Sequence, residues 1–382
     1  MITTPRYVID LDKFKSNCQD VMLQFTKEWG SNIKYGYSVK TNRDKELIKY
    51  ANKILNWNIE VVSSDEYNYV KSLLIDETQI ILNGPCKGNM FNSKFVLPNI
   101  VNLDNIMEVR LFASIFSNYE GFVGLRVNCN LENKCPNETT AGQEVSRFGI
   151  DAESHDFLDA IVILKKAGID NLGIHLHTST KTRSEKVFME LSREAVKLKK
   201  ISGVDFSFID IGGGFFGGQV VEGKPTMEKY AVSICNILKD EFDPSKTMLV
   251  LEPGASVLAT CVSYETKIIN KRVIRGVEVF TVDGTLLHIN PFMSNRNQPF
   301  EIVNLDGIRN KIDKQIIGGA TCMENDRLAT ITNDEQLFVG DVLSFKNVGA
   351  YTMGFNSYFI INPPKVKYIG GIDSEYFNNI CR

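Results

Sequence analysis

The chain has 382 residues, which is enough for two or three domains that each bury a hydrophobic core. Its composition, 43% hydrophobic and 23% charged, is that of an ordinary globular protein, and a net charge of −3 gives no overall positive field to hold a nucleic acid. No apolar run is long enough to cross a membrane and the start, MITTPRYVIDLDKF, lacks a signal-peptide pattern, so we expect a cytoplasmic protein without membrane contact. The 8 cysteines include no Cys-x-x-Cys pair, which favours reduced thiols and predicts no metal site.

The opening segment PRYVIDL is typical of a β-strand. Residues 30–255 then alternate short apolar runs with longer amphipathic stretches, as repeated βα units do. Eight parallel strands close a barrel, so the sequence predicts an α/β fold with a (β/α)8 TIM-like barrel. The predicted strands cover residues 33–38, 58–62, 79–83, 99–103, 122–128, 172–177, 206–211 and 248–252.

Two further stretches of the barrel region are informative. Phe188, Leu191, Ala195 and Leu198 share one helix face, which predicts a helix packed on the outside of the barrel. The stretch between Asn128 and Ser146 is polar and contains Pro and Gly, so it predicts an active-site loop or a flexible excursion rather than a helix.

After residue 255 the chain changes to closely spaced strand-like runs such as VLATCVSYETKII, RGVEVFTV, QLFVGDVLSF and YFIINPPKVKYI. These runs predict an all-β domain, a sandwich or barrel, and we expect the opening strand to pair into it. The predicted organisation is therefore a barrel over residues 30–255 and a discontinuous β domain over residues 1–29 and 256–382.

In such a barrel, reactive side chains come from the carboxyl ends of the strands. Lys40 follows the first strand, where a partly desolvated amine can act as a nucleophile, although its position alone favours an ordinary solvated loop lysine. His175 and His177 end the sixth strand two residues apart, and a ring packed against a flat ligand fits this pattern at least as well as a metal pair.

The last two strands end in glycine-rich turns. Gly212, Gly213 and Gly214 allow several backbone N–H groups to face one anion, although a tight structural turn accounts for them almost as well. Glu252 places an acid at the same barrel end, followed by Pro253-Gly254. In the β domain, GGATCMENDRL carries Cys322 and Asp326, and KNVGAYTMGFNSY carries Tyr351.

The order of these features, rather than any one of them, resembles a known family over nearly the whole chain: the fold type III pyridoxal-phosphate decarboxylases, the group of ornithine and diaminopimelate decarboxylases. YGYSVKTN resembles the family's F-Y-A-V-K-A-N, and VVSSDE resembles A-S-x-G-E. SRFGI, IDIGGGF, LEPG, CMEND (for C-x-x-x-D) and VGAYT follow in the expected order.

The resemblance implies a cofactor, pyridoxal 5′-phosphate, and a role for each matching residue. Lys40 would bind the cofactor as a Schiff base, His177 would stack on its ring, and Glu252 would pair with the ring nitrogen. Cys322 would protonate Cα after carbon dioxide leaves, from a loop that in the family enters the partner's barrel, so a homodimer with shared active sites is implied. The phosphate would be held by Thr180, Gly212, Gly213, Gly214, Gly254 and Tyr351.

Several positions depart from the family pattern. The arginine of E-P-G-R is Ala255 here, which removes a usual phosphate support. The acid that commonly follows the catalytic cysteine is Met323, so a bare distal ammonium would lack its charged acceptor. Glu324, Asp326 and, for a second carboxylate, Arg296 are the remaining candidate substrate contacts. We therefore expect an amino-acid-derived biosynthetic intermediate, larger or conjugated, in preference to ornithine, lysine or diaminopimelate.

Two alternatives remain open from the sequence. An amino-acid racemase uses the same fold, although the cysteine loop favours the decarboxylases. A non-catalytic relative of the antizyme-inhibitor kind has lost cofactor binding, and Ala255 gives that alternative some weight.

Overall fold

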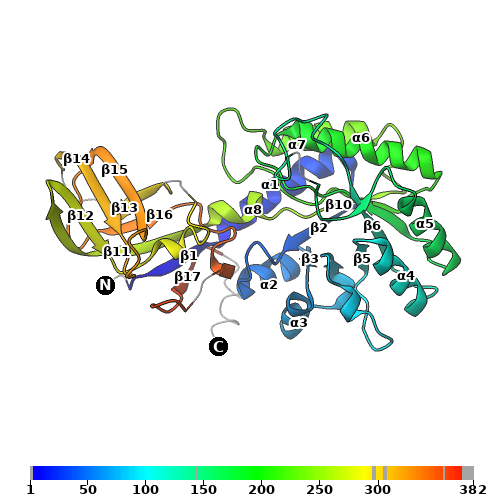
Figure 1. The fold of residues 1–382 in the computed structure, drawn as a ribbon, viewed down its shortest axis with the longest axis horizontal. Coiled ribbons are helices and arrows are strands. Elements are labelled where there is room, and N and C mark those ends of the chain that lie inside the picture. Colours follow the sequence, from blue (N-terminus) through cyan, green and yellow to red (C-terminus); the bar gives the residue numbers. More distant parts are fainter. Residues whose placement is uncertain (1–2, 143–144, 295–297, 304–307, 356–357, 372–382) are drawn as a thin grey trace. The chain divides into compact units, whose positions relative to one another are not determined.

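The structure is a computed structural model that describes residues 3–142, 145–294, 298–303, 308–355 and 358–371. The chain divides into two compact units (Figure 1). One unit is Cys18–Ser256, and the other combines Met1–Asn17 with Val257–Arg382. In the described part of the chain, no helix is long and apolar enough to span a membrane, and the cysteines are free thiols.

The first unit is a closed barrel of parallel strands. Each strand pairs with the next around the barrel, including the fourth with the fifth. The circle closes because the last strand pairs with the first. The predicted (β/α)8 barrel is therefore confirmed. In order around the barrel, the strands are β2 (Ile33–Ser38), β3 (Asn58–Val61), β4 (Ile80–Leu82), β5 (Ile100–Leu103), β6 (Phe122–Asn128), β8 (Leu172–His175), β9 (Phe208–Asp210) and β10 (Met248–Leu251), and β7 (Ile150–Asp151) pairs with β6.

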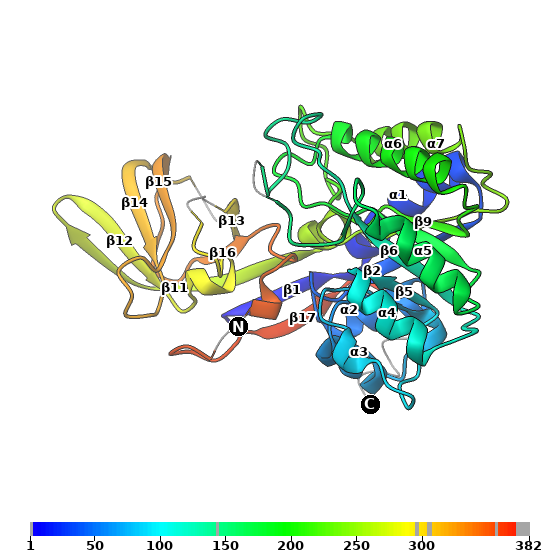
Figure 2. The same ribbon diagram turned by 45° about the vertical axis from the view of Figure 1, so that its right-hand side comes forward.

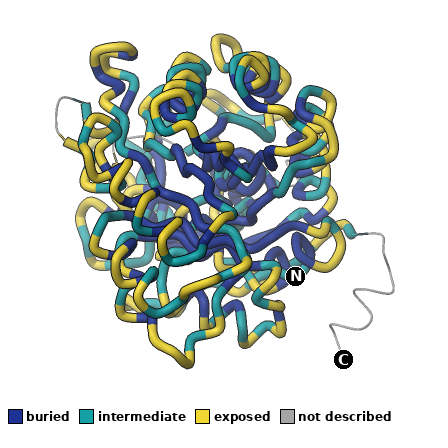
Figure 3. Tube along the Cα trace, turned by 90° about the vertical axis from the view of Figure 1, so that its right-hand side faces the viewer, coloured by how far each residue is buried: buried dark blue, intermediate teal, exposed yellow. Residues whose placement is uncertain are grey.

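Helices follow the strands and enclose the barrel, so the strands are buried while the outer turns of the helices are exposed (Figure 3). The predicted helix around Phe188 is α6, and the stretch from Cys129 to Gly142 contains no helix, as predicted. The helices are α1 (Leu11–Trp29), α2 (Lys45–Lys53), α3 (Ser64–Ser72), α4 (Ile106–Ile115), α5 (Asp156–Lys166), α6 (Glu185–Ser202), α7 (Met227–Leu238) and α8 (Ala255–Leu258).

Two neighbouring helices begin with the same local device. The side chain of Ser63 accepts a hydrogen bond from the Glu66 N–H, and the side chain of Asn105 accepts one from the Glu108 N–H. Each glutamate in turn accepts from the backbone N–H that precedes the cap, at 2.9 Å in both cases. These caps fix where the chain leaves β3 and β5, which sets the geometry of the barrel's carboxyl end.

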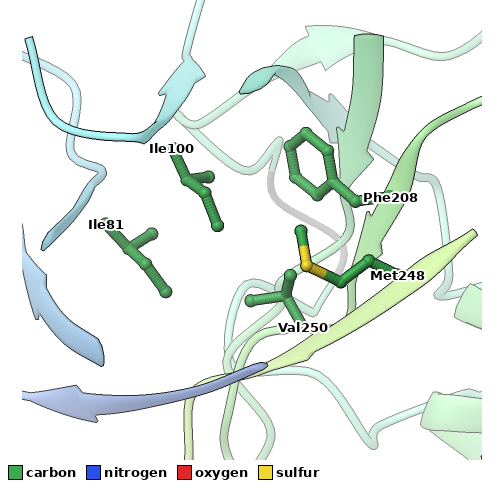
Figure 4. Close-up of a cluster of buried hydrophobic side chains, with 5 residues drawn as sticks. All are labelled: Ile81, Ile100, Phe208, Met248 and Val250. Carbon is green, nitrogen blue, oxygen red and sulfur yellow. The ribbon is translucent and has the colours of Figure 1, made fainter. Parts of the chain in front are cut away.

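The interior of the barrel is filled by side chains from alternate strands, so it is a packed core rather than a channel. The Phe208 ring occupies a place that two glycines leave open: a Cβ at Gly173 would lie 2.2 Å from the ring, and one at Gly124 would lie 2.9 Å from it. The buried cluster around it consists of Ile81, Ile100, Phe208, Met248 and Val250 (Figure 4).

The second unit is a curled, mainly antiparallel sheet with the order β13-β16-β11-β12-β14-β15. The opening strand β1 pairs antiparallel with β11 and parallel with β17, as predicted for PRYVIDL. β11 lies between β16 and β12 in this sheet (Figure 2): it pairs with β16 over Tyr264–Lys267 and with β12 over Ile268–Ile274, with a bulge between Ile268 and Asn270 in the second pairing. The strands are β1 (Arg6–Asp10), β11 (Val262–Ile274), β12 (Val277–Val282), β13 (Phe300–Val303), β14 (Lys311–Gly318), β15 (Arg327–Glu335), β16 (Val342–Phe345) and β17 (Lys365–Ile369).

Candidate active site

The carboxyl ends of the barrel strands surround a cavity of about 530 Å³. Three of the predicted site residues line it: Lys40 after β2, His177 after β8 and Glu252 after β10. The barrel therefore brings together side chains that are more than 200 positions apart at the extremes, Lys40 and Glu252. The lining also includes Glu60, Val62, Asn83, Gly84, Pro85, Arg126, Thr140, Ala141, Val145, Ser146, Arg147, Phe148, His175, Thr178 and Ser179.

Lys40 carries the amine of the site. Its Nζ forms an ion pair with Glu60, a fully buried residue of β3, and lies 3.3 Å from the Ser38 hydroxyl. Ser38 itself donates to Glu60 Oε2 at 2.8 Å. The lysine side chain keeps 34% of its exposure while Glu60 has none, so the carboxylate anchors the amine and leaves it accessible from the cavity.

A chain of side-chain amides connects the buried acids beneath the cavity. Asn83 Nδ2 donates to Glu252 Oε1 at 2.6 Å and to Glu60 Oε1 at 3.1 Å. Asn102 Nδ2 donates to Asn83 Oδ1 at 2.8 Å and to Asp210 Oδ2 at 2.9 Å. Because an amide holds each acid in place, the arrangement is fixed before any ligand binds.

Burial controls the protonation of the acids and of the histidines. Removal from water raises the pKa of Glu252 well above its usual value, and the neighbouring Asp210 raises it further. The pKa of Asp210 rises to about 7, again mainly because of burial. Burial lowers the pKa of His177 to about 3, and the positive charges of Arg126 and Lys40 add to this effect. His177 is therefore neutral near pH 7.

The histidine ring is held by the glycine-rich turn. Gly213 N–H donates to His177 Nδ1 at 3.3 Å. A Cβ at Gly212 would lie 2.6 Å from the same nitrogen, and a Cβ at Gly213 would lie 2.1 Å from the Glu252 carbonyl oxygen. Gly212 and Gly214 also have positive φ angles of 68° and 100°. Glycine is required here by close approach and by backbone conformation, and the turn presents bare backbone.

The remaining predicted phosphate residues of the barrel, Gly254 and Thr180, have different surroundings. A Cβ at Gly254 would lie 2.4 Å from Thr41 Oγ1, so the Glu-Pro-Gly turn also depends on glycine. The Thr180 hydroxyl accepts from the Arg183 N–H at 3.1 Å, and Ser179 rather than Thr180 lines the cavity.

Positive charge enters the cavity from β6 and from the segment that follows the long loop. Arg126 lies 4.4 Å and Arg147 lies 4.1 Å from the centre of the Phe148 ring. Arg126 Nη1 is also 3.5 Å from Asp104 Oδ1. The aromatic ring thus separates two guanidinium groups that both line the cavity.

Cys322 lies in the second unit, in a turn organised by Asp326. Asp326 Oδ1 accepts from Leu286 N–H at 2.7 Å and from the Thr285 hydroxyl at 3.0 Å. Its Oδ2 accepts from Thr321 N–H at 3.0 Å and from the Thr321 hydroxyl at 2.6 Å. The buried carboxylate is thus satisfied within the turn and shapes it, while the Cys322 thiol is exposed.

The other predicted residues of the second unit have distinct surroundings. Tyr351 is 40% exposed and has a left-handed backbone conformation, with φ of 56°. Met323 is half-buried, and Glu324 is exposed and forms an ion pair with Arg327. Arg296 lies outside the described residues.

Comparison with known proteins identifies the family. Residues 11–259, more than half of the chain, match the family model for "Pyridoxal-dependent decarboxylase, pyridoxal binding domain". The chain belongs to this family. Members of the family are carboxy-lyases that depend on pyridoxal phosphate. The cofactor of this protein is therefore pyridoxal 5′-phosphate.

Relatives and solved structures agree over nearly the full length. The chain is 26% identical to a diaminopimelate decarboxylase of Methanocaldococcus jannaschii over 95% of this chain and 85% of the relative. It is 25% identical to an ornithine decarboxylase of Caenorhabditis elegans over 91% and 82%. The same fold occurs in the M. jannaschii enzyme in complex with L-lysine, with a TM-score of 0.83, 23% identity and coverage of 96% and 87%. It also occurs in the arginine decarboxylase of Paramecium bursaria Chlorella virus, with a TM-score of 0.78, 19% identity and coverage of 96% of each chain.

The described residues of the cavity fit the cofactor of this family. A lysine amine and a buried carboxyl line one cavity, and the glycine turn beside them has no room for side chains. Both ring nitrogens of His175 are buried without a hydrogen-bond partner among the described residues. The donor set is therefore an amine, a carboxyl, a neutral imidazole and bare backbone, as a phosphorylated pyridine aldehyde requires.

Sequence reasoning missed several polar residues of this site: Glu60, Asn83, Asp210 and Arg126. A signal for two of them was present, because Glu60 and Asp210 are acids within the otherwise apolar runs NIEVV and FSFIDI. A charged residue in a buried strand is costly unless it is paired or functional.

Proposed function

We propose that this decarboxylase acts on an amino acid or amino-acid-derived intermediate whose distal group is not a bare ammonium. One observation supports the proposal most: Lys40, His177 and Glu252 come from three strand ends and line one cavity. When bound, pyridoxal phosphate supplies an electron sink for the bonding electrons that remain at Cα after carbon dioxide leaves.

The chain's own residues hold this cofactor in the proposal. Lys40 Nζ binds it covalently, with Glu60 as the counter-ion that orients the amine. The neutral His177 ring packs on its face, and Glu252 faces its ring nitrogen. The glycine turn at Gly212–Gly214 holds the phosphate with bare N–H groups, together with Gly254, Thr180 and Tyr351.

Cys322 is the proposed proton donor. Its Sγ would give a proton to the substrate Cα and become a thiolate, which would regain a proton from water when the product leaves the site. The Asp326 carboxylate positions the cysteine turn through its four hydrogen bonds. We place Cys322 in the active site of a second copy of this chain, so that the working unit is a homodimer.

The distal end of the substrate is inferred from the residues beside Cys322. Met323 presents a polarizable apolar surface and no charge, and Glu324 next to it is already paired with Arg327. A buried ammonium without a charged acceptor costs several kcal/mol. These contacts favour a distal group that is conjugated or otherwise uncharged.

The test of the cofactor assignment is chemical. Borohydride reduction of the holoenzyme followed by peptide mapping is expected to place the cofactor on the peptide that contains Lys40. Lys40→Ala is expected to abolish labelling, and Lys45→Ala, at an exposed lysine of α2, is expected to keep it. A labelled peptide elsewhere would overturn the assignment. Product mass then distinguishes loss of carbon dioxide from racemisation, which leaves the mass unchanged.

A further inference from the structure

Two carboxyl groups meet beneath the cavity at the ends of adjacent strands, Asp210 on β9 and Glu252 after β10. Asp210 has no exposure and Glu252 has 4%. Oxygen atoms of the two carboxyls and a ring nitrogen of His175 all lie within 4.8 Å of one another. Two ionised carboxylates at this separation, both out of water, repel strongly, so a buried pair of this kind retains a proton.

The hydrogen bonds of the two carboxyls are unequal. Asp210 accepts at both oxygens, from Gly212 N–H at 2.8 Å and from Asn102 Nδ2 at 2.9 Å. Glu252 accepts at Oε1 from Asn83, but its Oε2 is 3.9 Å from His175 Nε2, beyond hydrogen-bond distance. N–H donors stabilise the charged form of Asp210, so Glu252 Oε2 is the better place for a proton.

The charged groups around the pair do not change this assignment. Lys40 approaches from the end of β2 and Arg126 from β6, and each has its own acid, Glu60 and Asp104 respectively. Glu60, from β3, adds a further negative charge that raises the pKa of both members of the pair.

The imidazoles add no charge either. From β8 and the residues after it come His175 and His177, and both have lowered pKa values because they are buried. Both rings are therefore neutral near pH 7 and offer no counter-charge to a doubly ionised pair.

We infer that Asp210 and Glu252 hold one proton between them in the cofactor-free protein, that the proton rests on Glu252 Oε2, and that Asp210 is a positioning residue for it. This inference rests on the proposed role of Glu252 toward the ring nitrogen and adds the source of the proton. When Glu252 passes the proton from Oε2 to that nitrogen, the pair gains one negative charge and the ring gains one positive charge. No proton has to enter from solvent.

The first experiment uses the cofactor-free protein and infrared difference spectroscopy near neutral pH, with carbon-13 placed in glutamate or in aspartate side chains. The expected result is one protonated carboxyl band that shifts with labelled glutamate, does not shift with labelled aspartate and is absent from Glu252→Gln. Glu108→Gln is the matched control, because it removes another buried glutamate of the barrel, one that pairs with Lys87, and it is expected to keep the band. A wild-type spectrum without a protonated carboxyl, or with one that shifts with labelled aspartate, would overturn the inference.

The second experiment tests Asp210 itself. In Asp210→Asn the negative partner is lost, so the glutamate band is expected to disappear at a lower pH than in the wild type, and the absorbance of bound pyridoxal phosphate is expected to change its pH dependence. A merely structural residue would lower stability without moving either titration. Wild-type titration of the band needs no variant, so it still tests the proton on Glu252 if Asp210→Asn does not fold. Failure to take up pyridoxal phosphate would contradict the proposed function instead, because the infrared result does not depend on the cofactor.

Discussion

Asn83, the residue after β4, donates a hydrogen bond of 2.6 Å to Glu252, which lies 169 positions later in the chain. The same amide nitrogen donates to Glu60, the counter-ion of Lys40. One side chain thus connects the acid proposed to face the ring nitrogen with the acid that orients the proposed cofactor lysine. Asn83 therefore positions two acids of the site at once.

Replacement of Asn83 by leucine is expected to weaken cofactor binding. Leucine has a similar shape but no donor, so Glu60 and Glu252 each lose a hydrogen bond, and the bond to the charged Glu60 carboxylate alone contributes roughly 1.5–3 kcal/mol. At about 1.4 kcal/mol per factor of ten, the Kd for pyridoxal phosphate is expected to rise at least tenfold. Absorbance titration measures it. Asn171→Leu, at the opposite end of β8, where the side chain donates to the Glu120 carbonyl, is the control. An unchanged Kd in Asn83→Leu would show that the amide does not position Glu252.

Alanine at Gly213 is expected to distort the glycine turn. Its Cβ would lie 2.1 Å from the Glu252 carbonyl oxygen, which is backbone and has little freedom to move. Overpacking of this kind costs about 1–3 kcal/mol. Urea unfolding of the cofactor-free protein is expected to show that loss, and the cofactor content after dialysis is expected to fall. Gly88→Ala is the matched change, because its Cβ would meet only the Leu111 side chain at 3.6 Å. Equal stability of the two variants would contradict the expected clash.

The neutral His177 ring predicts a pH dependence of stability. Its pKa is about 3 in the folded protein against an ordinary value of 6.5, so below pH 6.5 the unfolded chain binds a proton that the folded one does not. The stabilisation that this histidine provides is complete above about pH 6.5 and is lost as the pH falls toward 3. His177→Gln lacks this contribution, so the difference in unfolding free energy between wild type and variant is expected to narrow over that interval. His155→Gln, at an exposed histidine before α5, is the control for the loss of a histidine outside the site. A difference for His177→Gln that stays constant with pH would show that the ring is not buried neutral.

Shared active sites predict complementation between inactive variants. Lys40→Ala and Cys322→Ala are each expected to be nearly inactive alone. If Cys322 acts in the partner's site, a dimer of one variant with the other has one intact site out of two. Random reassortment of subunits makes about half of the dimers mixed. Roughly a quarter of the wild-type number of active sites is therefore restored. Decarboxylase activity after verified subunit exchange measures this. If no activity returns, both residues belong to the site of one subunit.

The residue at position 323 predicts poor use of simple diamino acids. Ornithine, lysine and diaminopimelate are expected to have kcat/KM values below roughly 10⁴ M⁻¹s⁻¹, the low end for typical enzymes, because Met323 offers no charge to a distal ammonium. Met323→Asp is expected to lower KM for ornithine while kcat changes little, since only the distal contact is restored. Carbon dioxide release measures both. Efficient turnover of any of the three by the wild type would refute this interpretation of the cysteine turn.

The sequence by itself determined the barrel and much of its site. Each barrel strand is a short apolar run with polar or glycine residues at its end, and Lys40, His177 and Glu252 follow three such runs, where a parallel barrel places reactive groups. It did not reveal β14 and β15, because their burial is mixed and at least half of the residues in their sequences, KIDKQIIG and RLATITNDE, are polar. An amphipathic strand in a curled sheet leaves no apolar run to recognise.

Only the tertiary structure decided which polar groups are partners. Asp210, Asn83 and Asn102 are distant in sequence, and barrel closure brings them to Glu252 through hydrogen bonds that no local pattern encodes. Asp326 shows the same limit: its motif predicted a substrate contact, whereas four donors from two segments occupy its oxygens. The local pattern of apolar and polar residues indicates which side chains are buried, because burial depends on a residue's position within its own strand. The hydrogen-bond partners of buried polar groups come from segments that are distant in the sequence. They are therefore decided by how the fold brings those segments together.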